Sequence, residues 1–240
     1  MSLRKRALAI MDAATLRAAT RKYGLVGESI LYQDLPWIGL TGGRRGSGSS
    51  ARLDAILRYM LENKIPQRTS LDIGCNVGFF SLSLVERGCI AYGVEMERNA
   101  LRVAELIARN HIKGSGVFVP ILMECNPDTV EKLPQVETTI CLSIWHHWVR
   151  HQGLDAATMI LKSIWERTQY TLFFDSGESE MPPQYNLPFR DGDAVEWLNE
   201  YFHDSLAPTK ITNLGRFPAF APGQDERAGS VNRTMFAIQK

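Results

Sequence analysis

Short apolar runs alternate with amphipathic stretches through the middle of the chain, and this pattern predicts alternating strands and helices. Apolar runs predict strands at residues 70–73, 90–94, 117–122, 138–143 and 170–174. Apolar positions at helical spacing predict helices at residues 79–87, 99–109 and 155–168, and a short helix at 128–133. Such alternation is typical of a parallel sheet with helices on both faces.

The two ends of the chain depart from this alternation. After a helix predicted at residues 193–201, residues 210–214 and 234–239 predict two strands with no helix between them, which favours an antiparallel hairpin. At the start, a helix predicted at residues 3–22 is followed by a stretch rich in glycine and proline, and a further helix is predicted at 51–63. We therefore expect an α/β, Rossmann-like fold. Its seven-stranded, mostly parallel sheet would end in the hairpin and form the middle layer of an αβα sandwich. Residues 1–50 would be an N-terminal helix and a lid loop.

A glycine-rich turn joins the first predicted strand to the next helix, within Leu71–Ser81. Gly74 and Gly78 carry no Cβ atom, so the backbone there can approach a ligand closely. The N-terminal N–H groups of the following helix would point to the same place. Because ligands of open parallel sheets bind at the carboxyl ends of the strands, the turn predicts a nucleotide-cofactor site.

The spacing of the glycines in this turn argues against a dinucleotide as the bound cofactor. The dinucleotide fingerprint requires Gly-x-Gly-x-x-Gly, and here Asn76 and Phe79 occupy the second and third glycine positions. Glu95 follows the second predicted strand, about 20 residues beyond the turn, where a carboxylate can bind both ribose hydroxyls. The pattern therefore favours a ribose-containing cofactor without a pyrophosphate.

These residues resemble the first motif of the class I S-adenosylmethionine-dependent methyltransferases, Asp/Glu-x-Gly-x-x-x-Gly, and the acidic residue after their second strand. The resemblance covers roughly residues 54–240, and Asn76 stands where many members have glycine. It implies that residues 51–240 form a methyltransferase domain that binds S-adenosylmethionine. Glu124 is the candidate for an acidic residue near the adenine. The implied cofactor-binding residues are Asp72, Gly74, Cys75, Asn76, Gly78, Phe79, Glu95, Met96 and Ser143.

The residues after the fourth predicted strand bear on the methyl acceptor. Family members that methylate amines often carry Asn/Asp-Pro-Pro-Tyr/Phe there, whereas this chain has Ser143–Trp148 with two adjacent histidines. A hydroxyl loses its proton as it is methylated, and imidazole titrates near working pH. We therefore expect His147 or His146 to act as a general base toward a hydroxyl of a small molecule or glycan, as in sugar and natural-product O-methyltransferases. The other histidine is expected to pack against Trp145 or Trp148 as a wall of the adenine pocket, and His147 is preferred as the base.

Other charged residues are candidates for the acceptor site. Arg44, Arg45 and Arg190 are expected to bind an anionic group of the acceptor, and Asp175 is expected to contact it as well. Asp175 and Glu178 with a histidine also raise the question of a magnesium ion, because oxygen ligands suit that metal. A metal is not expected, since acidic loop residues after a strand more often cap helices or face solvent.

Composition limits the partners. The net charge of +1 gives no general signature for nucleic acid, but the first 45 residues are basic. An RNA-directed methyltransferase is therefore one alternative, and a non-catalytic protein that binds S-adenosylmethionine is another. No apolar run approaches the length of a membrane span, which is about 18 residues. Four widely spaced cysteines without a Cys-x-x-Cys pair predict reduced thiols and a cytoplasmic location. The sequence indicates no oligomeric state.

Overall fold

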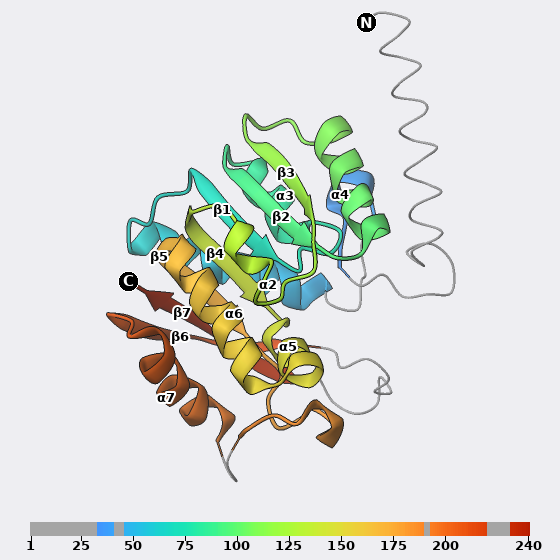
Figure 1. Ribbon diagram of the computed structural model, residues 1–240. Helices are drawn as coiled ribbons and strands as arrows, with labels where there is room; N and C mark the ends of the chain where they lie inside the picture. Colours follow the sequence, from blue (N-terminus) through green and yellow to red (C-terminus); the bar gives the residue numbers. More distant parts are fainter. Residues whose placement is uncertain (1–32, 41–45, 190–192, 220–230) are drawn as a thin grey trace, which may run out of the picture.

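The computed structural model describes residues 33–40, 46–189, 193–219 and 231–240. Its centre is a seven-stranded sheet with the order β3-β2-β1-β4-β5-β7-β6 (Figure 1). Neighbouring strands from β3 to β5 are parallel, and β7 is antiparallel to both β5 and β6. The predicted seven-stranded, mostly parallel sheet with a terminal antiparallel hairpin is thereby confirmed.

The elements follow the predicted sequence of strands and helices closely. The strands are β1 (Thr69–Ile73), β2 (Ile90–Glu95), β3 (Val117–Leu122), β4 (Val136–Leu142), β5 (Thr168–Asp175), β6 (Lys210–Pro218) and β7 (Asn232–Gln239). The α-helices are α2 (Gly46–Glu62), α3 (Phe79–Val85), α4 (Arg98–Asn110), α5 (Trp145–Gln152), α6 (Leu154–Arg167) and α7 (Ala194–Leu206). Short 3-10 helices are η1 (Pro36–Ile38), η2 (Val130–Lys132) and η3 (Pro183–Tyr185).

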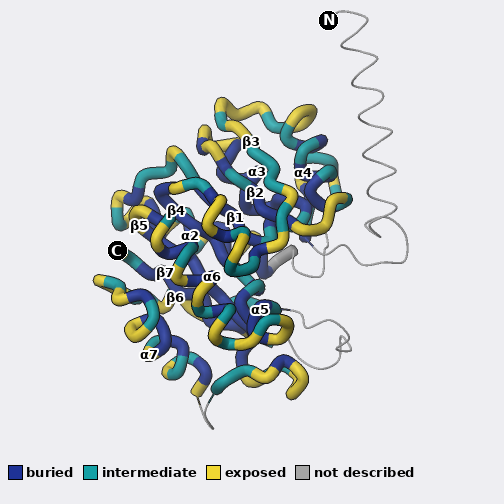
Figure 2. The backbone as a smooth tube through the Cα atoms, in the orientation of Figure 1, coloured by how far each residue is buried: buried dark blue, intermediate teal, exposed yellow. Residues whose placement is uncertain are grey.

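Successive side chains along a strand point to opposite faces of the sheet, so each central strand contributes side chains to the core on both faces. On β5, Leu172 and Phe174 belong to a core cluster with residues of α5, α6 and α7, whereas Phe173 lies in a second cluster with residues of α2 and α3. A third cluster joins α3 to α4. The buried layers are continuous through the middle of the molecule in Figure 2. The sheet is therefore the middle layer of an αβα sandwich.

The strand order reverses between β1 and β4. From β1 the chain proceeds outward through β2 to β3, then returns to place β4 on the other side of β1, where Leu71 pairs with Thr139. The loops that follow β1 and β4 therefore diverge to opposite faces and leave a crevice at the carboxyl ends of these strands. This is the position in which the sequence predicts a ligand.

Three α-helices differ from the prediction. Residues 145–152, which were not predicted to be helical, form α5. The helix predicted at 51–63 begins earlier, at Gly46, and the helix predicted at 193–201 continues to Leu206. The N-terminal helix predicted at residues 3–22 lies outside the described residues, as do Arg44, Arg45 and Arg190. The division at residue 50 and the cytoplasmic location stay predictions. Within the described part of the chain, no helix has the length and apolar character that crossing a membrane requires.

Candidate functional site

The turn after β1 has backbone conformations that require its glycines. Gly74 has φ of +69°, and a Cβ atom added there would overlap the side chain of Ile144 at the start of α5. Gly78 has φ of +87°, and an added Cβ would lie 2.8 Å from the Cβ of Ala104 on α4. L residues with a side chain rarely adopt such angles. The first glycine thus keeps the crevice beside α5 accessible, and the second lets α3 pack on α4.

Asp72 lies beneath this turn and organises it from inside. Its carboxylate accepts hydrogen bonds from the backbone N–H of Ser81 (3.1 Å) and from the Ser81 hydroxyl (2.6 Å), in the first turn of α3. Burial raises the pKa of Asp72 to about 6, because the loss of hydration outweighs the two Ser81 hydrogen bonds. The side chains of Cys75 and Phe79 are also buried. These three residues shape the turn from the protein interior.

Glu95, at the end of β2, is fixed by three backbone donors. One carboxylate oxygen accepts from the N–H of Asn76 (2.9 Å), and the other accepts from the N–H groups of Met96 and Glu97, both at 2.8 Å. The side chain is largely buried. Glu95 therefore ties the end of β2 to the glycine-rich turn and holds a carboxylate at the crevice.

A cavity of about 480 Å³ opens at the carboxyl ends of β1, β2 and β3 and is closed on one side by α5. Five of its lining residues come from α5 or the position before it, and they follow the helical spacing i, i+3, i+4, i+7, i+8. The cavity is lined by Ile73, Gly74, Val94, Glu95, Met96, Met123, Glu124, Cys125, Ile144, His147, Trp148, His151 and Gln152. Its size and largely apolar lining are those of a site for a small molecule or cofactor.

A smaller and more polar cavity of about 130 Å³ adjoins the first. The two share Gly74, Glu95, Ile144 and His147, so one extended ligand can occupy both. The small cavity is further lined by Gln33, Ser49, Arg52, Asn76, Phe80, Leu142 and Ser143. It therefore lies between the glycine-rich turn, α2 and the end of β4.

The two adjacent histidines have different surroundings. Consecutive positions on a helix point about 100° apart. His146 is buried, and its Nδ1 accepts a hydrogen bond from the N–H of Gly177 (2.9 Å) and lies 3.3 Å from the Ser176 hydroxyl. His147 is partly exposed and lines both cavities. His146 thus anchors the loop after β5, and His147 lines the space open to a ligand. That one of the two histidines packs on a tryptophan stays a prediction.

A buried ion pair supports the end of β4. Asp175 is fully buried, with one carboxylate oxygen 3.0 Å from Nε of Arg52 and the other accepting from the Ser143 hydroxyl at 2.9 Å. Ser143 has a positive φ of 60°, which turns the chain from β4 toward α5. The predicted contact of Asp175 with an acceptor stays a prediction. The structure gives this residue a supporting position behind Arg52 and Ser143.

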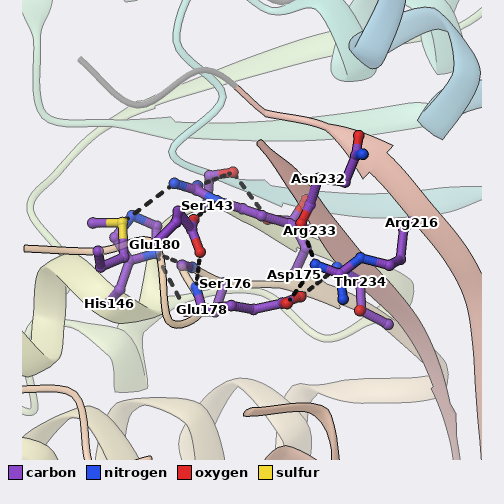
Figure 3. Close-up of polar contacts among 12 residues, drawn as sticks. Ser143, His146, Asp175, Ser176, Glu178, Glu180, Arg216, Asn232, Arg233 and Thr234 are labelled. Carbon is purple, nitrogen blue, oxygen red and sulfur yellow. Dashed lines mark hydrogen bonds and ion pairs between the residues drawn. The ribbon is translucent and has the colours of Figure 1, made fainter. Parts of the chain in front are cut away.

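Two further ion pairs attach the loop after β5 to the β6–β7 hairpin (Figure 3). Glu178 accepts from the N–H of Thr234 (2.6 Å) and lies 3.0 Å from the Arg216 guanidinium. Glu180 pairs with Arg233 at 2.6 Å. The acidic residues considered for magnesium are therefore engaged by arginines and a backbone donor. Among the described residues, no group of three or more His, Cys, Asp or Glu side chains is placed to hold a metal ion.

The structure brings together several of the residues that the sequence singled out. Gly74, Asn76, Glu95, Ser143 and His147 meet at the two cavities, together with Met96 and Glu124. Among the lining residues that the sequence did not single out are Gln33, Arg52 and His151. The helical spacing of residues 144–152 is a signal that points to His151, but Arg52 and Gln33 reach the site only through long-range packing.

Comparison with known proteins gives a partial match in sequence. No family model matches the chain. A segment of 99 residues, 41% of this chain, is 29% identical to the O-antigen chain terminator bifunctional methyltransferase/kinase WbdD of Escherichia coli. The matched segment spans only 14% of that larger protein. The likeness is thus to one region of a two-function enzyme.

Solved structures extend the likeness to nearly the whole chain. WbdD superposes on 93% of this chain and 45% of its own chain, with a TM-score of 0.66 and 21% identity. Magnesium protoporphyrin IX methyltransferase (ChlM) from Synechocystis PCC 6803, solved with bound S-adenosylmethionine, covers 80% of both chains with a TM-score of 0.56 and 12% identity. At these identities the likeness establishes the fold. The chain has the fold of the class I S-adenosylmethionine-dependent methyltransferases.

Proposed function

We propose that this chain is an S-adenosylmethionine-dependent methyltransferase that methylates a hydroxyl oxygen of a small molecule or glycan. One observation carries the proposal. The cavity at the strand-order reversal brings Gly74 of the turn, Glu95 of β2 and His147 of α5 into the same space. These residues come from three separate elements. Gly74 lets the backbone approach a ligand closely, Glu95 provides a carboxylate, and His147 provides a base.

The residues present fit this cofactor. The cavity of about 480 Å³ has apolar walls from Ile73, Met123 and Trp148, which suit an adenine ring. The Glu95 carboxylate stands at its edge and has about four acceptor positions, of which backbone N–H groups use three. The acceptor position that remains would bind a ribose hydroxyl. A side chain at position 74 would overlap Ile144, and both residues line the two cavities.

His147 is the base in this proposal. When bound, the cofactor supplies a methyl group on a positively charged sulfur. The acceptor hydroxyl must lose its proton as its oxygen takes the methyl group, and His147 would receive that proton. The unprotonated nitrogen of a neutral imidazole can accept such a proton. The remaining contribution of the protein is to hold the two reactants in line and exclude water.

Two observations support the proposed class of methyl acceptor. One is the absence of the motif typical of enzymes that methylate amines, and the other is the names of the similar proteins. The residues after β4, Ser143–Trp148, contain no Asn/Asp-Pro-Pro-Tyr/Phe sequence. The names of the similar proteins point to an O-antigen chain in one case and to magnesium protoporphyrin IX in the other. A glycan and a small molecule are therefore the acceptor classes to test first.

The test is incubation with S-adenosylmethionine carrying a labelled methyl group and fractionated cell extract. We expect label in a glycan or small-molecule fraction, and loss of that label with the His147→Ala variant. Label in an RNase-sensitive fraction would instead support the RNA-directed alternative. Cofactor binding without label in any fraction would support a non-catalytic binding protein.

A further inference from the structure

Three side-chain rings meet beside the cavities, and they come from two segments of the chain. The rings of His146 and His147 on α5 lie 4.4 Å apart between centroids, at an interplanar angle of 40°. The ring of Tyr185, from η3, lies 5.8 Å from each imidazole. Aromatic rings attract one another at such separations. His147, which lines both cavities, therefore has one ring neighbour on its own helix and another on the loop after β5.

His146 is the fixed member of the histidine pair. It is buried, and its Nδ1 accepts a hydrogen bond from the N–H of Gly177 at 2.9 Å. A Cβ atom added at Gly177 would overlap the side chain of Met181, so this close approach of the loop to α5 depends on the glycine. The His146 ring thus gives His147 a firm surface on one side.

Tyr185 is 7% exposed and is held by the loop that carries it. Its N–H donates to the carbonyl of Pro182 at 3.0 Å. Pro182 and Pro183 in succession restrict the backbone of this turn. Glu178 and Glu180 attach the preceding part of the loop to the β6–β7 hairpin (Figure 3). The loop therefore holds the Tyr185 ring in a fixed position against the histidines.

Arg150 joins the same ring to α5. Its guanidinium carbon lies 4.7 Å from the centroid of the Tyr185 ring, within the distance of a cation–π interaction. Residues three positions apart on a helix are neighbours on its surface, so Arg150 and His147 meet Tyr185 from the same side of α5. The turn of α5 that carries His147 is thereby tied to η3.

We infer that Tyr185 is a positioning residue, which holds the His147 imidazole in the orientation that proton transfer requires. A histidine side chain rotates about two bonds, and the rings of His146 and Tyr185 restrict that rotation. The restriction matters because a displacement of about 1 Å can slow a reaction about 100-fold. This role rests on the proposed function, since Tyr185 acts only through His147.

The test measures methyl transfer with and without His147. The assay follows a single turnover of labelled S-adenosylmethionine with the extract fraction that the wild-type chain labels. Tyr185→Leu should lower the rate by roughly 10- to 100-fold. Tyr185→Phe retains the ring and should stay within about threefold of the wild type. In the His147→Ala background, Tyr185→Leu should lower the remaining rate by less than about threefold, because the residue through which it acts is absent.

Tyr59→Leu is the matched control, because it also removes a buried tyrosine ring. Tyr59 is 5% exposed, packs on Phe173 at 5.9 Å between centroids and lines neither cavity. Tyr59→Leu should lose stability, as Tyr185→Leu does, and retain the wild-type rate. Calorimetric titration should give both variants the wild-type affinity for S-adenosylhomocysteine, since Tyr185 is also absent from the lining of the two cavities.

Arg150→Gln keeps the inference testable if Tyr185→Leu fails to fold, because Arg150 is exposed. The variant removes the cation over the Tyr185 ring and leaves the ring in place. It should lower the rate by about 2- to 5-fold, the equivalent of an exposed cation–π interaction, and only where His147 is present.

Three results would overturn the inference. One is a wild-type rate in a folded Tyr185→Leu variant. Another is an equal loss in Tyr185→Leu and Tyr185→Phe, which would give the hydroxyl a direct part in the reaction. The third is a full effect of Tyr185→Leu in the His147→Ala background, or an equal loss in Tyr59→Leu, since either would indicate a general structural effect. If His147→Ala retains the wild-type rate, the proposed function fails first, and the role of Tyr185 falls with it.

Discussion

The two halves of the crevice are built in different ways. The donor half, meaning the turn at residues 74–81 with Glu95, is held mainly by backbone conformation and backbone N–H groups. The acceptor half, meaning residues 143–152 with the loop at 175–185, is held by buried side chains such as Asp175, His146 and Glu178. Backbone geometry in the donor half demands particular residue types at fixed spacing, whereas the acceptor half depends on partners that are distant in sequence.

The largest change in activity should result from a substitution in the acceptor half. His147→Ala should lower kcat by about 10²- to 10⁴-fold, because general-base catalysis contributes about that much, and should leave S-adenosylhomocysteine affinity nearly unchanged. Single-turnover kinetics and calorimetry on the same preparation measure the two quantities.

His146→Ala is the paired variant for this prediction. It removes the acceptor of the Gly177 N–H, so it should reduce the free energy of unfolding by about 1–3 kcal/mol and lower kcat less than His147→Ala does. If both variants retain wild-type turnover, neither histidine is the base and the proposed mechanism is wrong.

The next effect should come from the donor half. Gly74→Ala places a Cβ against Ile144 and forces a positive φ on a residue with a side chain. We expect S-adenosylhomocysteine affinity to fall by roughly 10-fold or more, the equivalent of the 1–2 kcal/mol that this conformation costs.

Gly88→Ala provides the control for this variant. Gly88 also has a positive φ, of +93°, but it precedes β2 at the opposite end of the strand from the crevice, and an added Cβ would meet the Ser115 hydroxyl at 3.2 Å. Gly88→Ala should lose about as much stability as Gly74→Ala but retain the wild-type affinity for S-adenosylhomocysteine. Equal affinity in both alanine variants would show that the Gly74 backbone does not shape the ligand site.

The buried Asp72 carboxylate, which lies beneath the donor half and accepts from Ser81, should affect how the free energy of unfolding depends on pH. Burial raises the pKa of Asp72 from 3.8 to about 6, so between these values the native state binds more protons than the unfolded chain. The associated stabilisation is present below pH 4 and is lost as the pH rises through 6. Relative to Asp72→Asn, the wild type should therefore lose up to about 3 kcal/mol between pH 4 and 7.

Urea denaturation of both proteins at pH 4, 5, 6 and 7 measures this difference. A wild-type chain that gains stability over Asp72→Asn as the pH rises would contradict the assignment of a raised pKa.

The smallest effect should come from the exposed side of the acceptor half. Arg216 is 56% exposed, so its pair with Glu178 is screened by solvent. Arg216→Met should change the free energy of unfolding by less than about 1 kcal/mol. Glu178→Ala should cost more, because it also leaves the Thr234 N–H without its acceptor. Thermal denaturation of the two variants measures which one loses more stability. A larger loss for Arg216→Met would contradict the conclusion that the Thr234 N–H contact of Glu178 matters more than its exposed ion pair.

The same contrast explains what the sequence could predict. The alternation of apolar runs was sufficient to predict the sheet, its parallel part and the terminal hairpin, because the strands read as apolar runs bounded by turn residues. Helix α5 escaped prediction because it has only eight residues and is rich in tryptophan and histidine. Its residues Trp145, Trp148 and Val149 pack into the core, whereas His147, His151 and Gln152 line the cavity.

Within the site, Gly74, Gly78 and Glu95 were accessible to sequence reasoning because one short turn and one strand end fix their relation. The separate surroundings of His146 and His147 were not, since the Gly177 N–H that engages His146 lies 31 positions away. Arg52 is 123 positions from Asp175, by subtraction of their numbers, and no local pattern links them. Such pairs depend on the tertiary fold.

The most direct test of the central claim is calorimetric titration of the wild-type chain with S-adenosylhomocysteine and, separately, with NAD. We expect one-to-one binding of S-adenosylhomocysteine, with stabilisation of about 2.7 kcal/mol at a ligand concentration of 100 times Kd, and no binding of NAD at the same concentrations. Absence of S-adenosylhomocysteine binding, or tighter binding of NAD, would contradict it.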